Sequence, residues 1–579
     1  MDIDEKGESS VDVRIQTVTA RPSFRHAFRT WSSFNRYIKT DAGRNLPGNG
    51  HIWENEGWCG PLPLFCSRGL IKRKRPSPLP RRASDLGNRF LLRFLVLRVD
   101  EYEYLGRCIL DDYPRIGMTW WHAILVVFSA NMLSSVILVL NGYASSGWHI
   151  GYPVLVRTSF GVVGSFFAVT IRSMLGIVWF GIQCTFGGYF VSICLRCIWP
   201  SWYTMDNHIP ESIGITSRDL AGFGIFWIIS VGFLAMPPYK TRWLFIVKSF
   251  LLPPTGLGLL IWALKKNHGF TGMSFGATQS SGSTLAWAVI AQFNAVMGTN
   301  SALLVTVPDI TRYARRRSAQ TQGQLFSLPI GQTLWATCGI MVTAAMNRQW
   351  DTAYWNPYDL LNVMLDHDMS SPSRAGCFFA SAAFILATLG TSIANNTIPF
   401  GADITALLPR YLTMVRGQVF LYSLGEYYLV PQDSLPSSTD TRYSWGLSLV
   451  IIDYFLVHKG NLQLAGLFTG LRDGPYYYTW GVNWRAIIAF IAGTGIPFPG
   501  FVQSFGSVAI GEVAEEMFDF GWLASFGIGA IIYWVLCRVF PVENVDRCLT
   551  FEAELERIER EEVERRIKEE YPDGVPYIY

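Results

Sequence analysis

Long apolar runs, separated by short polar connections, dominate the chain from residue 119 onward. About twenty apolar residues form a helix that crosses the ~30 Å hydrocarbon core of a bilayer, and backbone in contact with lipid has little alternative to a helix. The pattern therefore predicts an all-α polytopic membrane protein. The predicted spans are residues 119–140, 165–198, 220–236, 243–264, 284–307, 328–346, 378–397, 419–430, 444–457, 484–501 and 521–540.

The composition agrees with this pattern. Of 579 residues, 50% are hydrophobic and 16% are charged, whereas soluble domains carry roughly 25% charged residues. Charge is dense before about residue 101 and after residue 542. We therefore expect a polar and basic N-terminal region at 1–118, a transmembrane domain at 119–540 and a charged tail at 541–579, with both ends cytoplasmic. The basic residues lie mostly at the ends of apolar runs, so no nucleic-acid partner is expected.

The basic connections predict the orientation of the spans, because loops rich in Lys and Arg stay on the cytoplasmic side. By this rule the connections after the third, fifth and seventh spans are cytoplasmic. The basic segment 72–82 should be cytoplasmic too, which conflicts with the span at 119–140 unless one earlier span is missing. The runs 419–430 and 444–457 are too short to cross alone. The basic residues in the three connections are Lys240, Arg242, Arg312, Arg315, Arg316, Arg317, Arg410 and Arg416.

The second predicted span carries a candidate site for a flat ligand. Trp179 and Gln183 are four residues apart and share one helical face. A Trp ring can stack on a heterocycle while a Gln amide donates and accepts hydrogen bonds at its edge. The same pair equally fits an aromatic packing face in which Gln183 bonds a neighbouring helix. Spacing alone does not separate the two interpretations.

The fifth predicted span has small polar residues at its middle, where Thr299 and Asn300 follow Gly298. Such residues can satisfy the backbone groups of a broken helix, so a break is expected at 298–301. Close helix packing uses the same residues and remains an alternative. The Pro308–Asp309 step, with Arg312 after it, is expected to end the helix and anchor it at the cytoplasmic face.

The seventh predicted span contains the densest cluster of uncharged polar residues. Asn395 and Asn396 are adjacent, and Thr391 and Ser392 precede them. Amides are costly in hydrocarbon unless they face a polar cavity or bond a neighbouring helix, and both outcomes stay open. Uncharged amides suit a neutral polar ligand. Two charged residues within spans, Arg172 and Lys248, also need partners, although a Lys can extend its charge to the interface.

No enzyme motif accompanies these segments. The sequence lacks HExxH, GxSxG and the phosphate-binding GxxxxGK[ST] pattern. Cys194 and Cys197 form a lone CxxC, for which a structural role is favoured over a metal site. The sequence therefore predicts a protein that is not an enzyme and has no metal site or cofactor.

Several motifs together resemble the nucleobase–cation symporter-1 family, specifically its fungal uracil/uridine/allantoin/thiamine permease branch. The resemblance covers roughly residues 120–420 and 450–540, with the motifs in the order of the family. The matching stretches are WHIGYPVLVRTSFGVVGS, IVWFGIQCTFGG, IPESIGITS, PDITRYARR, SLPIG, WNPYDLL, LGTSIANNTIPFGADITALLPRY, IIDYFLVHKG and IPFPGF.

The resemblance implies two inverted five-helix repeats plus two helices, working by alternating access. Trp179 would stack on the substrate, Gln183 would bond its edge and Asn395 would supply an amide contact. Two departures concern the helices themselves: the family's first helix has no counterpart here, and the ninth is cut between Tyr422 and Tyr443. The predicted substrate-binding residues are Trp179, Gln183, Thr299, Asn300, Asn395 and Asn396.

The resemblance also implies a function. We expect a secondary active transporter of the plasma membrane that imports a nucleobase, nucleoside or related heterocycle such as uracil, uridine or allantoin. The co-transported cation would be a proton, the usual ion in fungi, or sodium. A thiamine-type vitamin transporter and a non-transporting membrane receptor or scaffold are the alternatives. The partners are then the heterocycle, the cation and the lipid bilayer.

Overall fold

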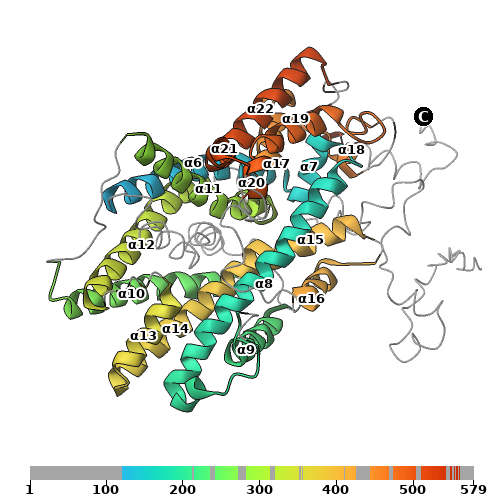
Figure 1. The fold of residues 1–579 in the computed structure, drawn as a ribbon. Helices are drawn as coiled ribbons and strands as arrows, with labels where there is room; N and C mark the ends of the chain where they lie inside the picture. The colour runs from blue at the N-terminus through green and yellow to red at the C-terminus, as the bar shows by residue number, and fades with distance from the viewer. Residues whose placement is uncertain are drawn as a thin grey trace, which may run out of the picture.

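The computed structural model describes residues 120–560 except for 211–213, 235–241, 271–281, 313, 315–319, 351, 353, 355, 410, 426–443, 469–471, 473, 504–509, 543–544, 546–547, 551–552, 555 and 558–559. Its regular structure is helical throughout this part of the chain, apart from two isolated β-bridges, Leu462–Leu549 and Thr479–Val482 (Figure 1). The prediction of an all-α protein is confirmed.

Each predicted apolar run contains a helix, and within the described residues seven helices are long and apolar enough to cross a membrane. The helices at the predicted spans are α6 (Trp120–Trp148), α8 (Ser165–Ile198), α9 (Ser217–Leu234), α10 (Arg242–Lys266), α11 (Ser283–Thr311), α12 (Thr321–Trp350), α14 (Ser371–Ser392) continued by η5 (Ile393–Thr397) and α15 (Ile398–Leu407), α16 (Met414–Gly425), α17 (Ser444–Ile452) continued by η8 (Asp453–Val457), α19 (Trp484–Gly495), α20 (Phe498–Gln503) and α22 (Gly521–Val539).

Short helices that the apolar pattern does not predict lie between the spans. They are too short or too polar to produce a long apolar run. These elements are α7 (Tyr152–Phe160), η2 (Pro200–Thr204), α13 (Pro357–His367), α18 (Leu464–Phe468) and α21 (Glu512–Asp519).

Two predicted irregularities concern the missing first helix and the truncated ninth. The N-terminal region where the first helix would lie is outside the described residues. Helix α16, at the ninth position, has 12 residues. The segment that follows α16 is also outside the described residues.

The helices pack in three groups. Helices α6, α11 and α12 form one, and α8 packs with α9, α14 and α15 in the second. The third consists of α17, α19 and α22. In Figure 1, α8 and α14–α15 run side by side below the other two groups, which contact each other through α11 and α17. Helix α10 connects the first two groups because it contacts both α12 and α14.

Glycines bring α8 and α9 into direct backbone contact. A Cβ added to Gly222 of α9 would lie 2.5 Å from the carbonyl oxygen of Gly188 in α8. Two residues that both lack a Cβ allow this approach, as in other close helix pairs of membrane proteins. The contact fixes the position of α8, the helix that carries Trp179 and Gln183.

Helix α11 is continuous, so the predicted break at 298–301 is wrong for this conformation. Its hydroxyl side chains form hydrogen bonds with carbonyl oxygens of the preceding turn, so no break in the helix is needed. Thr299 Oγ1 donates to Ala295 O at 3.0 Å, and Ser301 Oγ donates to Met297 O at 2.9 Å. Such bonds to the preceding turn let hydroxyl residues sit inside an apolar helix.

The Pro308–Asp309 step also differs from its prediction. Helix α11 continues through it to Thr311, and Asp309 is fully buried rather than at a membrane surface. The carboxylate is buried because it pairs with Arg172 of α8.

Candidate functional site

Five of the six predicted binding residues line one pocket between α8, α11 and the α14–η5 segment. Helix α8 contributes Trp179 and Gln183, α11 contributes Thr299, and the α14–η5 segment contributes Asn395 and Asn396. Ala302 and Thr391 complete the lining. In this conformation the free cavity is about 10 Å³, room for about one water molecule, so a ligand enters only when these residues move apart.

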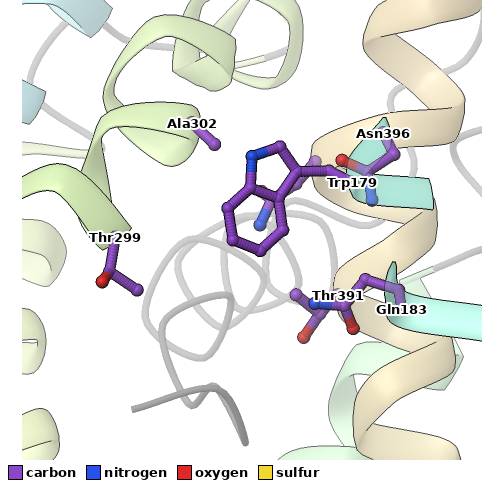
Figure 2. Close-up of a pocket in the computed structure, with 7 residues that line it drawn as sticks. Trp179, Gln183, Thr299, Ala302, Thr391 and Asn396 are labelled. Atoms are coloured by element: carbon purple, nitrogen blue, oxygen red, sulfur yellow. The ribbon is translucent and has the colours of Figure 1, made fainter. Parts of the chain in front are cut away.

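The indole ring of Trp179 occupies the middle of this pocket. Figure 2 shows the ring between Thr299 and Ala302 of α11 on one side and Gln183, Thr391 and Asn396 on the other. The aromatic face and the polar groups therefore meet across a narrow space. A planar ligand entering this space would stack on the indole and reach amide groups at its edge.

The backbone widens into a π-turn at the two asparagines. Residues 393–397 form η5, and Ile398 N donates to Ile393 O, five residues back. Pro399 explains the change, because a proline has no N–H and its ring clashes with the carbonyl four residues earlier, here that of Asn395. Single π-turns of this kind occur frequently at functional sites.

The amide groups at the π-turn have capacity for a ligand. The Oδ1 atom of Asn395 is buried and accepts no hydrogen bond within the described part of the chain. A buried acceptor without a donor costs roughly 1–3 kcal/mol. A ligand N–H that bonds Asn395 Oδ1 would recover this energy. An amide also donates, so the site suits a ring that carries both N–H and C=O groups.

Asn300 is the predicted binding residue that does not line the pocket. Its Nδ2 donates to Asn131 Oδ1 at 2.9 Å and to Ser134 Oγ at 3.0 Å, both on α6. The side chain is fully buried in this helix contact. Its position matches the packing alternative that the sequence left open. Ser301 next to it accepts a hydrogen bond from Trp522 Nε1 of α22 at 2.6 Å.

A buried cation lies directly behind the pocket wall. Lys248 of α10 donates from Nζ to Thr391 Oγ1 at 2.7 Å, and its side chain is 1% exposed. Thr391 itself lines the pocket. The lysine therefore does not extend to a membrane interface. Its Nζ contacts Thr391, whose side chain lies between the lysine and the space in which a ligand would bind.

A second pocket continues from the first along α8. It shares Trp179, Asn395 and Asn396 with the first pocket, and its free cavity is likewise about 10 Å³. At its far end it is lined by Arg172 and Asp403. The two pockets together trace a path from the indole to a group of buried charges.

These charges form an ion triad that joins α8, α11 and α15. Arg172 Nε donates to Asp403 Oδ2 at 2.7 Å, and a second nitrogen of the same guanidinium pairs with Asp403 Oδ1. Arg172 Nη1 donates to Asp309 Oδ2 at 2.8 Å. All three side chains are at most 4% exposed. We call the end of the molecule that contains Arg172, Asp309 and Asp403 the triad end.

The triad carries one positive and two negative charges, and the N-terminus of α7 helps to balance them. Tyr152 N, in the first turn of α7, donates to Asp309 Oδ1 at 3.1 Å. The positive end of a helix dipole stabilises a carboxylate at this position. The Cζ atom of Arg172 also lies 4.1 Å from the centroid of the Tyr152 ring, in a cation–π contact. Short helix α7 is thus tied to the triad.

Sequence reasoning missed both carboxylates of the triad. It treated Asp309 as a surface anchor, and it ended the seventh span at residue 397, before Asp403. The helix continues to Leu407, so Asp403 lies inside it. A buried Arg in an apolar run requires an acidic partner, and Arg172 was therefore the signal for a search among the acidic residues near the span ends.

Within the described residues, no group of three or more His, Cys, Asp or Glu side chains is arranged to hold a metal ion. The first pocket presents aromatic, amide and hydroxyl groups to a ligand, and the second adds the paired charges of Arg172 and Asp403. Helical spans around a partly polar pocket are typical of multi-pass membrane transporters.

The family model described as permease for cytosine/purines, uracil, thiamine, allantoin matches residues 112–524. The chain therefore belongs to this family, the nucleobase–cation symporter-1 permeases, as the motifs predicted. The relatives are permeases and transporters, in agreement with the prediction that the protein is not an enzyme.

Two relatives come from Saccharomyces cerevisiae. The allantoin permease is 33% identical over 74% of this chain and 70% of its own length. The uracil permease is 29% identical over 74% of this chain and 70% of its own length. The fold is similar to that of Mhp1, a nucleobase-cation-symport-1 family transporter solved in a closed conformation with bromovinylhydantoin bound. The TM-score is 0.60 at 19% identity, covering 80% of this chain and 95% of Mhp1.

The triad yields a prediction about stability. Replacing Arg172 by Gln leaves two carboxylates buried without their cation, which costs about 3–5 kcal/mol. We expect Arg172→Gln to lower the thermal unfolding temperature of the purified protein strongly. The double variant Arg172→Gln/Asp403→Asn restores the original net charge and should recover part of the loss. Equal unfolding temperatures for the single variant and the unchanged protein would show that the triad does not hold these helices together.

Proposed function

We propose that this protein is a cation-coupled importer of a neutral nitrogen heterocycle, with uracil, uridine and allantoin as the leading substrates. The observation that carries the proposal is the pocket in which the Trp179 ring faces the amides of Gln183, Asn395 and Asn396. Uracil is planar, and the uracil ring of uridine and the hydantoin ring of allantoin are nearly planar. Each of these rings carries alternating N–H and C=O groups. Stacking and paired amide bonds recognise such an edge without any charge.

The π-turn supports this assignment because it gives the pocket an acceptor that needs a donor. Asn395 Oδ1 is buried and accepts no hydrogen bond within the described residues. A site built to bond a substrate N–H rejects analogues that lack it, because its own polar groups then stay unpaired. The names of the yeast relatives, an allantoin and a uracil permease, fit a substrate with this chemistry.

We assign the triad the role of closing the substrate path at its cytoplasmic end. In this proposal the triad end faces the cytoplasm, because the connections that follow α11 and α15 contain several Arg residues. The second pocket leads from the indole to Arg172 and Asp403 at this end. A substrate released inward must pass this point, so Arg172 and Asp309 must separate during the cycle. With the same orientation, we propose a plasma-membrane protein whose C-terminal tail is cytoplasmic.

The buried lysine favours a proton over sodium as the coupling ion. Lys248 Nζ bonds Thr391, a residue of the pocket wall. A fixed ammonium there repels a metal cation, whereas an amine at the same place can itself take up and release a proton. Each charge moved inward gains about 2.3 kcal/mol per 100 mV of membrane potential.

Uptake of labelled heterocycles tests the proposed function. In cells that lack their own transporters, we expect the protein to import at least one of uracil, uridine and allantoin, with thiamine as the contrasting member of the panel. Asn395→Ala removes an amide from the pocket and should raise the Km by roughly fivefold to 150-fold, equivalent to about 1–3 kcal/mol.

Asn300→Ala is the matched control, since it removes the same side chain from a helix contact outside the pocket. Its uptake, corrected for the amount of protein at the surface, should keep the original Km. Correctly localised protein that imports no member of the panel would refute transport. Equal Km values for the Asn395 variant and the unchanged protein would remove this amide from the site.

Lys248→Met tests the coupling ion, because methionine retains much of the side-chain volume without the charge. We expect uptake by the unchanged protein to rise as the external pH falls and to persist when choline replaces sodium. Lys248→Met should lose the pH dependence and the ability to concentrate substrate. The control is Lys266→Met, at an exposed position of the same helix. A sodium requirement, or an unchanged pH profile in the Lys248 variant, would contradict proton coupling through this residue.

A further inference from the structure

The loop at 474–483 braces the turn between α7 and α8 at the triad end, and we call it the brace loop. Its backbone bonds this turn directly. Val163 N donates to Gly481 O at 2.8 Å, and Asn483 N donates to Phe160 O at 2.9 Å. The turn is therefore held by a segment more than 300 positions later in the chain, just before α19.

Side chains of the brace loop extend the contact to the end of α7. Tyr478 Oη donates to Thr158 O at 2.5 Å, and Asn483 Nδ2 donates to Ser159 O at 2.7 Å. Asn483 is fully buried. These bonds satisfy carbonyl groups in the last turn of α7, where a helix has no partners of its own for them.

Two residues of the brace loop have a backbone conformation that is rare for them, and hydrogen bonds to the α7–α8 turn hold the loop in place. Tyr478 and Trp480 have φ values of 47° and 56°, in the left-handed region that residues other than glycine rarely adopt. Gly481 follows with φ 85°, and a Cβ there would lie 2.3 Å from Val163 Cγ2. Strained residues persist where surrounding contacts fix them. Here they turn one side chain away from the protein.

That side chain is Trp480, which is 87% exposed. An indole carries a large apolar area, so its exposure to water is unfavourable. Trp484, four positions later, packs edge to face on Phe540 at the end of α22, with the ring centroids 5.4 Å apart. Arg485 joins them, since its Nε donates to Phe540 O at 2.8 Å. The start of α19 and the end of α22 thus present aromatic rings and a guanidinium at the same level.

The surface next to the brace loop is the outer face of the spans. Exposed apolar side chains continue from it along α8, α19 and α22, the surface that lipid tails cover in a multi-pass membrane protein. Trp rings gather where such a surface meets the headgroups. The exposed apolar residues concerned are Val163, Phe167, Ile488, Ile491, Val535, Val539 and Phe540.

We propose that Trp480 anchors the brace loop in the headgroup region of the leaflet at the triad end, and that this phospholipid contact stabilises the α7–α8 turn. The indole lies among acyl chains near the glycerol level, with its N–H toward the headgroups. The lipid contact fixes the loop at one depth in the membrane. The hydrogen bonds between the loop and residues 158–164 then restrain the turn.

The turn in question connects the two elements that meet the triad. Helix α7 bonds Asp309 through Tyr152 N at its start, and α8 carries Arg172 two turns after it begins. A turn held by lipid therefore restrains both partners of the ion pair. Loss of the lipid contact should loosen this end of the molecule while the pocket residues keep their contacts.

Photocrosslinking tests the contact itself. A photoreactive phenylalanine analogue replaces Trp480 in the full chain, which is then reconstituted in nanodiscs of phosphatidylcholine and phosphatidylserine, irradiated and analysed by mass spectrometry. We expect phospholipid adducts at position 480. The analogue at Trp534, an exposed position of α22, should also give lipid adducts, whereas at the buried Trp522 it should give none.

Each other product at position 480 would overturn the proposal. Adducts to residues 1–119 would show that another part of this chain covers the indole, and adducts between two copies would show an oligomer contact. Absence of any adduct, with Trp534 reacting normally, would show that the indole faces water.

Hydrogen exchange tests the effect on the turn. In nanodiscs, Trp480→Ala should speed exchange of the amides of residues 162–164 about tenfold. Trp480→Phe should restore much of the protection, because it retains an aromatic ring. Trp199→Ala is the matched control at an exposed Trp on the opposite end of α8, and it should leave these amides unchanged. Unchanged exchange in Trp480→Ala would show that the lipid contact does not support the turn.

Discussion

The buried ion triad is the constraint on which the arrangement of this protein depends. One guanidinium is shared by two carboxylates where water is excluded, so none of the three groups is stable without the others. Arg172, Asp309 and Asp403 come from three helices of two packing groups. Helix α7 adds its N-terminus to the same cluster. The apolar spans determine that helices form, and the triad determines how three of them meet.

The pocket lies next to this constraint, and its chemistry follows from local backbone structure. Pro399 disrupts the regular hydrogen bonding of the helix, and the resulting π-turn places Asn395 and Asn396 on the pocket lining opposite Trp179. The path from the indole ends at the triad. Substrate binding and closure of the path are therefore adjacent, which suits a transporter that must admit a ligand from one side and release it to the other.

The sequence predicted the helices well because the requirement for apolar length in lipid is strong and local. It also predicted the pairing of Trp179 with Gln183, since helical spacing fixes a shared face. It failed at 298–301, where polar side chains bond their own helix or α6 instead of breaking the backbone. It overlooked Asp403 because the polar residues before it resembled the end of a span. Which helix faces which depends on contacts between distant residues, and no local pattern encodes these.

If the protein transports a heterocycle as proposed, the substrate binds between Trp179 and the π-turn. A cryo-EM structure of the protein with substrate bound would show where the ligand lies. We expect density for a planar ring against the Trp179 indole, within hydrogen-bonding distance of Asn395 or Asn396, with the Arg172–Asp309 pair intact when the inner end is closed. Ligand density elsewhere, with the indole packed only against protein, would contradict this placement of the substrate.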